Sequence, residues 1–177
     1  MYEDKLGRIR AICFDVDGVL TDGRILAVDN GELYRQFDAK DAFAMRMAAS
    51  NGYILGCITG GRSLSIRQRM AICGVEDEDI YLHSHRKILD FNDFCLRHGL
   101  SADQVMYIGD DIPDIPVLQA CGFSVAPADA CEEVREIVDF VTPEGGGRQC
   151  MRHALKMVLA FQGRWGLEHG NYFERNF

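Results

Sequence analysis

The chain has 177 residues, of which 47% are apolar, and this predicts one globular domain over residues 1–177 rather than a disordered chain. The net charge of −8 offers no basic stripe for phosphate backbones, which excludes nucleic-acid binding as a default function. No apolar run approaches the roughly 20 residues of a membrane-spanning helix, and seven scattered cysteines without a CxxC pair favour a reduced, cytoplasmic protein.

Short apolar runs alternate along the chain with amphipathic segments. The apolar runs predict buried strands at residues 9–14, 53–58, 105–108 and 123–125. The amphipathic segments predict helices at residues 41–51, 63–73, 86–98, 113–121, 132–137 and 150–161. This alternation predicts an α/β fold with a doubly wound, mostly parallel, Rossmann-like sheet.

One segment departs from the alternation. Residues 24–37 read as two short strands, 25–28 and 33–37, around Asp29-Asn30-Gly31, and Asn-Gly is a strong hairpin-turn signal. This predicts a β-hairpin flap beside the end of the first strand. No segment is long enough for a separate cap domain. Residues 163–177, with Trp165, Tyr172 and Phe173, lack helical periodicity and are expected to form an extended arm that packs on a neighbouring subunit.

Polar residues follow the ends of three predicted strands. Asp15 and Asp17 follow the first strand, and Thr59 follows the second. The third strand is followed by Gly109-Asp110-Asp111-x-x-Asp114, and Lys87 lies at the start of a predicted helix. Because ligands bind at the carboxyl ends of strands in open α/β sheets, we expect these side chains to meet in one site.

Five aspartates at one edge would repel one another strongly, by roughly 4 kcal/mol for two charges 4 Å apart at an effective dielectric of 20. A divalent cation with oxygen ligands removes this cost, and Mg²⁺ typically takes one or two carboxylates with water and phosphate. Thr59 and Lys87 add a hydroxyl donor and a positive charge for phosphate oxygens. Together these residues predict a magnesium-dependent phosphoryl-transfer site.

At these residues the chain resembles the haloacid dehalogenase superfamily, whose four motifs match in order. The resemblance implies that Asp15 is the nucleophile that forms an aspartyl-phosphate and that Asp17 is the general acid and base. Thr59 and Lys87 match the second and third motifs.

The same resemblance implies a Mg²⁺ site built from Asp110, the Asp15 carboxylate and the Asp17 backbone carbonyl. Asp111 and Asp114 are expected to hold waters and Lys87 around it.

The sequence Asp-Val-Asp-Gly-Val-Leu-Thr-Asp-Gly, the hairpin and residues 37–41 look more narrowly like the capless 3-deoxy-D-manno-octulosonate 8-phosphate phosphatase family. This implies hydrolysis of an eight-carbon sugar-acid phosphate for lipopolysaccharide synthesis. It also implies a homotetramer whose hairpins meet at the central axis and whose subunits share active sites.

The chain departs from the family pattern in two places: Gly61-Arg62-Ser63 replaces Arg-x-Ser, and residues 145–153 retain only the glycines and an arginine. Both departures affect the expected substrate contacts, and Arg148 is an alternative to Arg152 as one of them. These expected contacts are Lys40, Gly60, Gly61, Arg62 and Arg152.

Three other functions remain open on the sequence alone. A nine-carbon, sialic-acid-type phosphate could be the substrate of the same chemistry. A phosphoacceptor receiver domain also combines acid pairs, threonine and lysine, although its acid pair ends the first strand as adjacent residues. A tetrameric scaffold without activity is the third, and the complete acid set argues against it.

Overall fold

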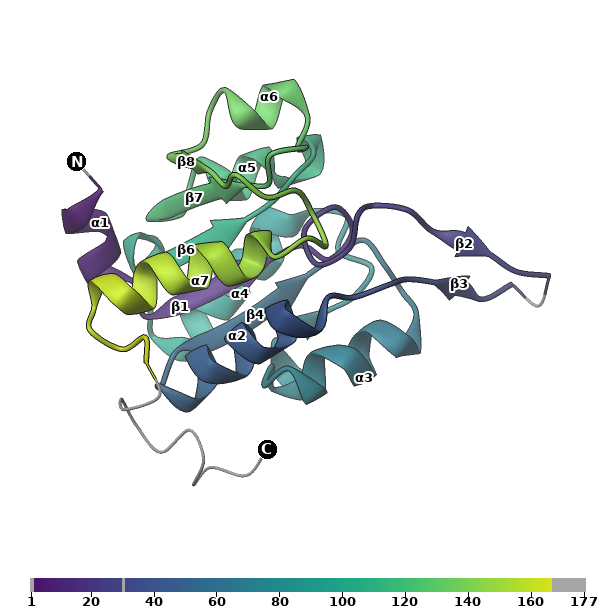
Figure 1. The fold of residues 1–177 in the computed structure, drawn as a ribbon, viewed down its shortest axis with the longest axis horizontal. Helices are drawn as coiled ribbons and strands as arrows, with labels where there is room; N and C mark the ends of the chain where they lie inside the picture. Colours follow the sequence, from purple (N-terminus) through teal and green to yellow (C-terminus); the bar gives the residue numbers. More distant parts are fainter. Residues whose placement is uncertain (1, 30, 167–177) are drawn as a thin grey trace.

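A six-stranded parallel sheet forms the centre of the molecule (Figure 1). The computed structural model describes residues 2–29 and 31–166. The strand order is β5-β4-β1-β6-β7-β8, and every pairing in this sheet is parallel. The strands are β1 (Ala11–Phe14), β4 (Ile54–Ile58), β5 (Ile80–Tyr81), β6 (Val105–Ile108), β7 (Phe123–Ala126) and β8 (Phe140–Val141).

The predicted fold class is confirmed, and all four predicted strands lie in this sheet. The two edge strands, β5 and β8, were not predicted, because two residues are too few to show a hydrophobic pattern. Within the described chain, no cap domain interrupts the elements of the sheet.

Helices cover both faces of the sheet. The helices are α1 (Glu3–Arg8), α2 (Ala39–Ser50), α3 (Leu64–Ile72), α4 (Lys87–His98), α5 (Ile115–Leu118), α6 (Glu132–Arg135) and α7 (Cys150–Phe161). One core cluster contains buried residues of α1, α2, α3 and α7, and a second contains those of α4, α5 and α6. Strand β1 contributes alternate residues to the two clusters, so it is buried on both faces and reads as a continuous apolar run.

The predicted helix ends differ from the structure at several helices, as at α6, which ends at Arg135 rather than at residue 137. The helix predicted at residues 113–121 is shorter, because a 3₁₀ turn (Ile112–Asp114) precedes α5. Helix α2 begins two residues earlier than predicted, since the Asp38 carboxylate accepts the backbone N–H of Lys40 at 2.6 Å and caps it. Helix α1 was not predicted at all.

The hairpin is present but its paired part is short. Strand β2 (Leu26–Ala27) pairs antiparallel with β3 (Leu33–Tyr34) in a separate two-stranded sheet. Figure 1 shows this hairpin extending away from the body of the molecule, beyond the carboxyl ends of β1 and β4. Leu26 and Tyr34 are 63% and 53% exposed there.

The segment before α7 supports the loop that follows β1. The Gly147 N–H donates to the Val19 carbonyl at 2.9 Å, and the Cys150 thiol donates to the same oxygen at 3.1 Å. A Cβ at position 146 would lie only 2.0 Å from the Gly18 carbonyl oxygen, so glycine is required for this close approach.

The expected arm at residues 163–177 lies mostly outside the described residues, including Tyr172 and Phe173. Trp165 is described, and it packs against the chain's own core. Among the described residues, none of the helices is long and apolar enough to span a membrane.

Helix α7 should contribute strongly to stability through its buried stripe. Leu155→Ala removes a fully buried side chain, so we expect a loss of about 2–5 kcal/mol in the free energy of unfolding, measured by urea denaturation. The neighbouring, exposed Lys156→Ala is the control and should change this free energy by less than about 0.5 kcal/mol. Equal effects of the two substitutions would contradict the burial of this stripe.

Candidate active site

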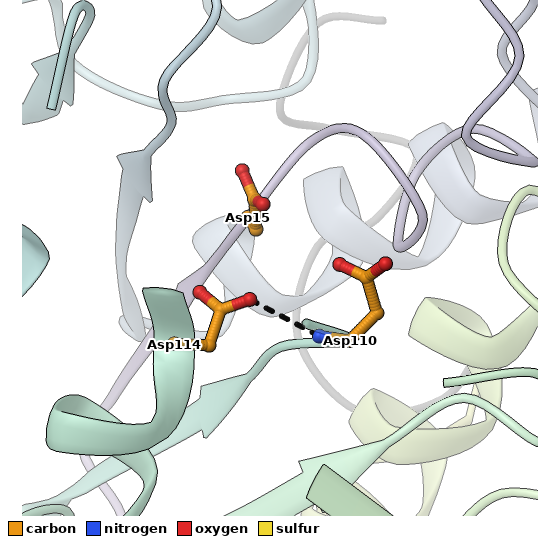
Figure 2. A group of neighbouring side chains, drawn as sticks. All are labelled: Asp15, Asp110 and Asp114. Carbon is orange, nitrogen blue, oxygen red and sulfur yellow. Dashed lines mark hydrogen bonds between the residues drawn. The ribbon is translucent and has the colours of Figure 1, made fainter. Parts of the chain in front are cut away.

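Three carboxylates converge at the carboxyl edge of the sheet. Asp15 follows β1, Asp110 follows β6, and Asp114 ends the 3₁₀ turn after it. Each offers an oxygen, and these three oxygens lie within 4.8 Å of one another. Figure 2 shows the three side chains pointing toward a common space. Strands β1 and β6 are parallel neighbours, which is why residues far apart in sequence meet here.

Lys87, the first residue of α4, forms an ion pair with two of these carboxylates. Its ammonium lies 2.7 Å from Asp15 Oδ2 and 2.7 Å from Asp114 Oδ1, and its side chain is 4% exposed. Although burial opposes the charged form, the carboxylates of Asp15 and Asp114 raise the pKa of Lys87 above its ordinary value. The lysine therefore remains a cation at the floor of the site.

Asp114 has partners for both of its oxygens. One oxygen accepts from Lys87 and from the Tyr107 hydroxyl at 2.6 Å, and the other accepts the backbone N–H groups of Asp110 and Asp111. These contacts agree with the expected role of Asp114 in holding Lys87, and they leave Asp114 less suited to direct metal coordination than Asp15 and Asp110.

Of the three carboxylates, that of Asp110 has the least compensation for its negative charge. Its Oδ1 is buried without a hydrogen-bond partner. Burial, then the charges of Asp15 and Asp114, raise the pKa of Asp110 to about 8. Burial likewise raises the pKa of Asp15 to about 6, although Lys87 opposes the shift. In both carboxylates the effect of burial exceeds that of the positive charge of Lys87, so a hard divalent cation fits this site.

Gly18 leaves room beside Asp110. Its φ is +83°, and a Cβ at this position would lie 1.9 Å from Asp110 Oδ2. A larger residue would therefore displace a carboxylate of the group that a cation would join.

The site opens into a cavity of about 390 Å³. Thr59 is buried there, and its hydroxyl accepts the Gly61 N–H at 3.1 Å. Because β4 pairs parallel with β1, Thr59 follows β4 at the edge where Asp15 follows β1. The cavity is lined by Asp15, Asp17, Gly23, Thr59, Gly60, Gly61, Ser84, His85, Lys87, Asp110, Asp111, Pro113 and Asp114. The expected catalytic and metal residues are thus brought together, with Gly60 and Gly61 beside them.

In the described part of the chain, the other expected substrate contacts do not line this cavity: Lys40, Arg62 and Arg152. The Arg152 guanidinium lies over the rings of Phe43 and Trp165, at 5.5 and 5.3 Å from their centroids. Arg148, the rival candidate, lines a separate cavity beside the base of the hairpin. Contacts from these residues to substrate remain predictions.

Sequence reasoning missed Arg35. This residue follows β3, and its guanidinium binds both carboxylate oxygens of Asp17, with Nε–Oδ1 and Nη2–Oδ2 distances of 2.7 and 2.9 Å. The Arg35 side chain is only 3% exposed. In the sequence, Arg35 looks like one polar residue of an alternating strand, and no motif singles it out.

Comparisons with known proteins agree with this geometry. A family profile for haloacid dehalogenase-like hydrolases matches residues 76–145. The chain is 34% identical to the 3-deoxy-D-manno-octulosonate 8-phosphate phosphatase of Escherichia coli strain K12 over 160 residues, which cover 90% of this chain and 84% of that protein. The chain belongs to the 3-deoxy-D-manno-octulosonate 8-phosphate phosphatase family.

Two solved structures of this phosphatase family contain metal. The cobalt-bound Haemophilus influenzae phosphatase has a TM-score of 0.86 and 35% identity, and the match covers 90% of this chain and 92% of that one. The Moraxella catarrhalis phosphatase, in complex with magnesium ion, phosphate ion and KDO, has a TM-score of 0.87 and 27% identity, covering 91% of each chain. Membership of this family of phosphoric monoester hydrolases removes the receiver-domain alternative.

The metal-free phosphatase should lose stability as pH rises. Asp110 has a pKa of about 8 in the folded chain and 3.8 as its ordinary value, so the folded state binds more protons than the unfolded state between about pH 4 and 8. The free energy of unfolding should therefore fall across this window, by a few kcal/mol, since each tenfold change in proton affinity corresponds to about 1.4 kcal/mol.

This is measured by urea denaturation in EDTA at pH 5, 6.5 and 8. Asp110→Asn should flatten the dependence, and Mg²⁺ should restore the stability of the unsubstituted protein at pH 8. Two results would contradict the charge distribution described above. One is a free energy of unfolding that rises with pH in EDTA, and the other is the same pH dependence of that free energy in Asp110→Asn as in the unsubstituted protein.

Proposed function

We propose that this protein is a Mg²⁺-dependent phosphatase that hydrolyses 3-deoxy-D-manno-octulosonate 8-phosphate to the free sugar acid and phosphate. The observation that supports this most directly is the shared edge at which Asp15, Asp110 and the ammonium of Lys87 meet. The choice of substrate is supported by the family and by relatives whose names include 3-deoxy-D-manno-octulosonate 8-phosphate.

Asp15 is the proposed nucleophile. One of its carboxylate oxygens attacks phosphorus, the bond to the sugar oxygen breaks, and Asp17 gives a proton to the departing alkoxide. Asp17 then takes a proton from water, which attacks phosphorus and releases Asp15 and inorganic phosphate. Mg²⁺, when held by Asp15, Asp110 and the Asp17 carbonyl, supplies positive charge to the phosphate oxygens.

The remaining residues of the cavity are proposed to stabilise the transferred phosphoryl group. Lys87 provides a charge that is already fixed by Asp15 and Asp114 before substrate binds. The Thr59 hydroxyl and the backbone N–H of Gly60 are proposed as neutral donors in the same cavity. A nine-carbon sugar-acid phosphate would undergo the same chemistry, and comparing turnover of the two substrates decides between them.

We also propose that the protein works as a homotetramer in the cytoplasm, in the supply of sugar acid for lipopolysaccharide. The exposed apolar residues of the hairpin, Ile25, Leu26 and Tyr34, support an interface between copies of the chain. Seven unpaired cysteines support a reducing compartment.

The catalytic proposal is tested by phosphate release from both sugar-acid phosphates, with Mg²⁺ and with EDTA. Asp15→Asn should lower kcat by at least about 10³-fold, because it removes the nucleophile. EDTA should abolish turnover of the unsubstituted protein. Asp103→Asn, at an exposed acid far from the cavity, is the matched control and should leave kcat within twofold, roughly.

Circular dichroism should show that the Asp15→Asn variant remains folded. Turnover retained by folded Asp15→Asn would remove Asp15 from the nucleophile role, and the absence of turnover with every sugar-acid phosphate would reject the proposed substrate class.

The proposed assembly is tested on the hairpin. Leu26→Asp places a charge on a side chain that is 63% exposed in the single chain, so it should dissociate the tetramer while leaving the subunit folded. Leu96→Asp, at an 81% exposed position on α4, is the matched control. Analytical ultracentrifugation should show smaller species only for the hairpin variant. A tetramer unaffected by Leu26→Asp would exclude the hairpin from the interface.

A further inference from the structure

The ion pair between Arg35 and Asp17 connects the hairpin to the proposed general acid. Arg35 lies directly after β3, and Nη1 of its guanidinium also donates to the Leu33 carbonyl at 3.3 Å and to the Ser63 hydroxyl at 3.0 Å. All three nitrogens therefore have acceptors, and the side chain is almost fully buried. A guanidinium held in this way fixes the carboxylate it binds in one orientation.

The Asp17 carboxylate lies outside the group of three cavity acids that could share a cation. Among the described acids, the group whose oxygens gather within 4.8 Å consists of Asp15, Asp110 and Asp114, and Asp17 does not join it. Asp17 nevertheless lines the same cavity, and its side chain is 26% exposed. Arg35 thus holds the carboxylate at the hairpin side of the cavity, away from the cation position.

An Asp17 carboxylate without Arg35 would find two other positive partners in the cavity, which are Lys87 and a bound cation. Either partner would draw it away from the leaving group. With Arg35 present, each Asp17 oxygen still has a second lone-pair site that can face the cavity, so proton exchange does not require the ion pair to break.

We propose that Arg35 is a positioning residue that keeps the Asp17 carboxylate off the metal site and directed at the leaving-group oxygen. The division of labour in Asp17 then has a physical cause: the backbone carbonyl is available to the cation, while the side chain is reserved for the proton. The part of this inference that concerns the leaving group rests on the proposed function, and the part that concerns the metal does not.

The first test measures Mg²⁺ affinity by isothermal titration calorimetry at fixed pH and ionic strength. Arg35→Met should tighten Mg²⁺ binding by about tenfold, because the freed Asp17 carboxylate adds an anionic ligand. The gain should largely disappear when Arg35→Met is combined with Asp17→Asn, compared with Asp17→Asn alone. An unchanged Kd in Arg35→Met, or an equal gain in the Asp17→Asn background, would overturn the proposal.

The second test compares leaving groups. Arg35→Met should lower kcat for a sugar-acid phosphate, whose alkoxide needs a proton, by about tenfold or more. With p-nitrophenyl phosphate, the rate of the p-nitrophenolate burst should fall by less than about threefold, because that leaving group departs without a proton. Equal losses on both substrates would indicate a merely structural role and would overturn the proposal.

Two further variants keep the test decisive. Arg67→Met removes another arginine–aspartate ion pair, with Asp77, on α3, and should change neither readout. If Arg35→Met does not fold, Arg35→Lys keeps the charge but loses the two-nitrogen fork, and it should still slow the sugar-acid phosphate more than the aryl phosphate. An unsubstituted protein without phosphatase activity would reject the proposed function, while the calorimetric test of Arg35 would remain valid.

Discussion

The buried ammonium of Lys87 lies between the carboxylates of Asp15 and Asp114, and the site depends on this balance of charge. Lys87 satisfies one oxygen of each aspartate, but the cluster still carries more negative than positive charge. The unpartnered oxygen of Asp110 and its raised pKa show where the imbalance remains. The fold therefore stabilises the acids partly with its own lysine and leaves a defined deficit that a divalent cation fills.

The parallel sheet explains why so small a set of residues can make this site. Strands β1, β4 and β6 are neighbours in the sheet and run in the same direction, so the residues that follow them emerge at one edge. Asp15, Thr59 and Asp110 need only to be the first or second residue after their strands. Lys87 comes from the start of a helix and Arg35 from the base of the hairpin.

The sequence predicts the parts of this arrangement that repeat a simple pattern. The four central strands appear as continuous apolar runs because both faces are covered, and α7 appears as a stripe because only one face is buried. The edge strands β5 and β8 could not be predicted from the sequence, since two residues show no hydrophobic periodicity. Arg35 could not be found either: its importance lies in a contact with Asp17 across a turn of chain that no local spacing encodes. For Arg152 a motif position suggests a substrate contact; its guanidinium lies over the rings of Phe43 and Trp165, and the contact with substrate stays a prediction.

The support that residues 146–150 give to the loop after β1 has a consequence for biosynthesis. The loop carrying Asp17 and Gly18 is made early by the ribosome, whereas the glycines and thiol that hold Val19 are made near the end. A nascent chain that has formed β1, β4 and β6 still lacks this support. Hydrolysis of phosphate esters should therefore begin only after the segment before α7 has been made and has packed against this loop.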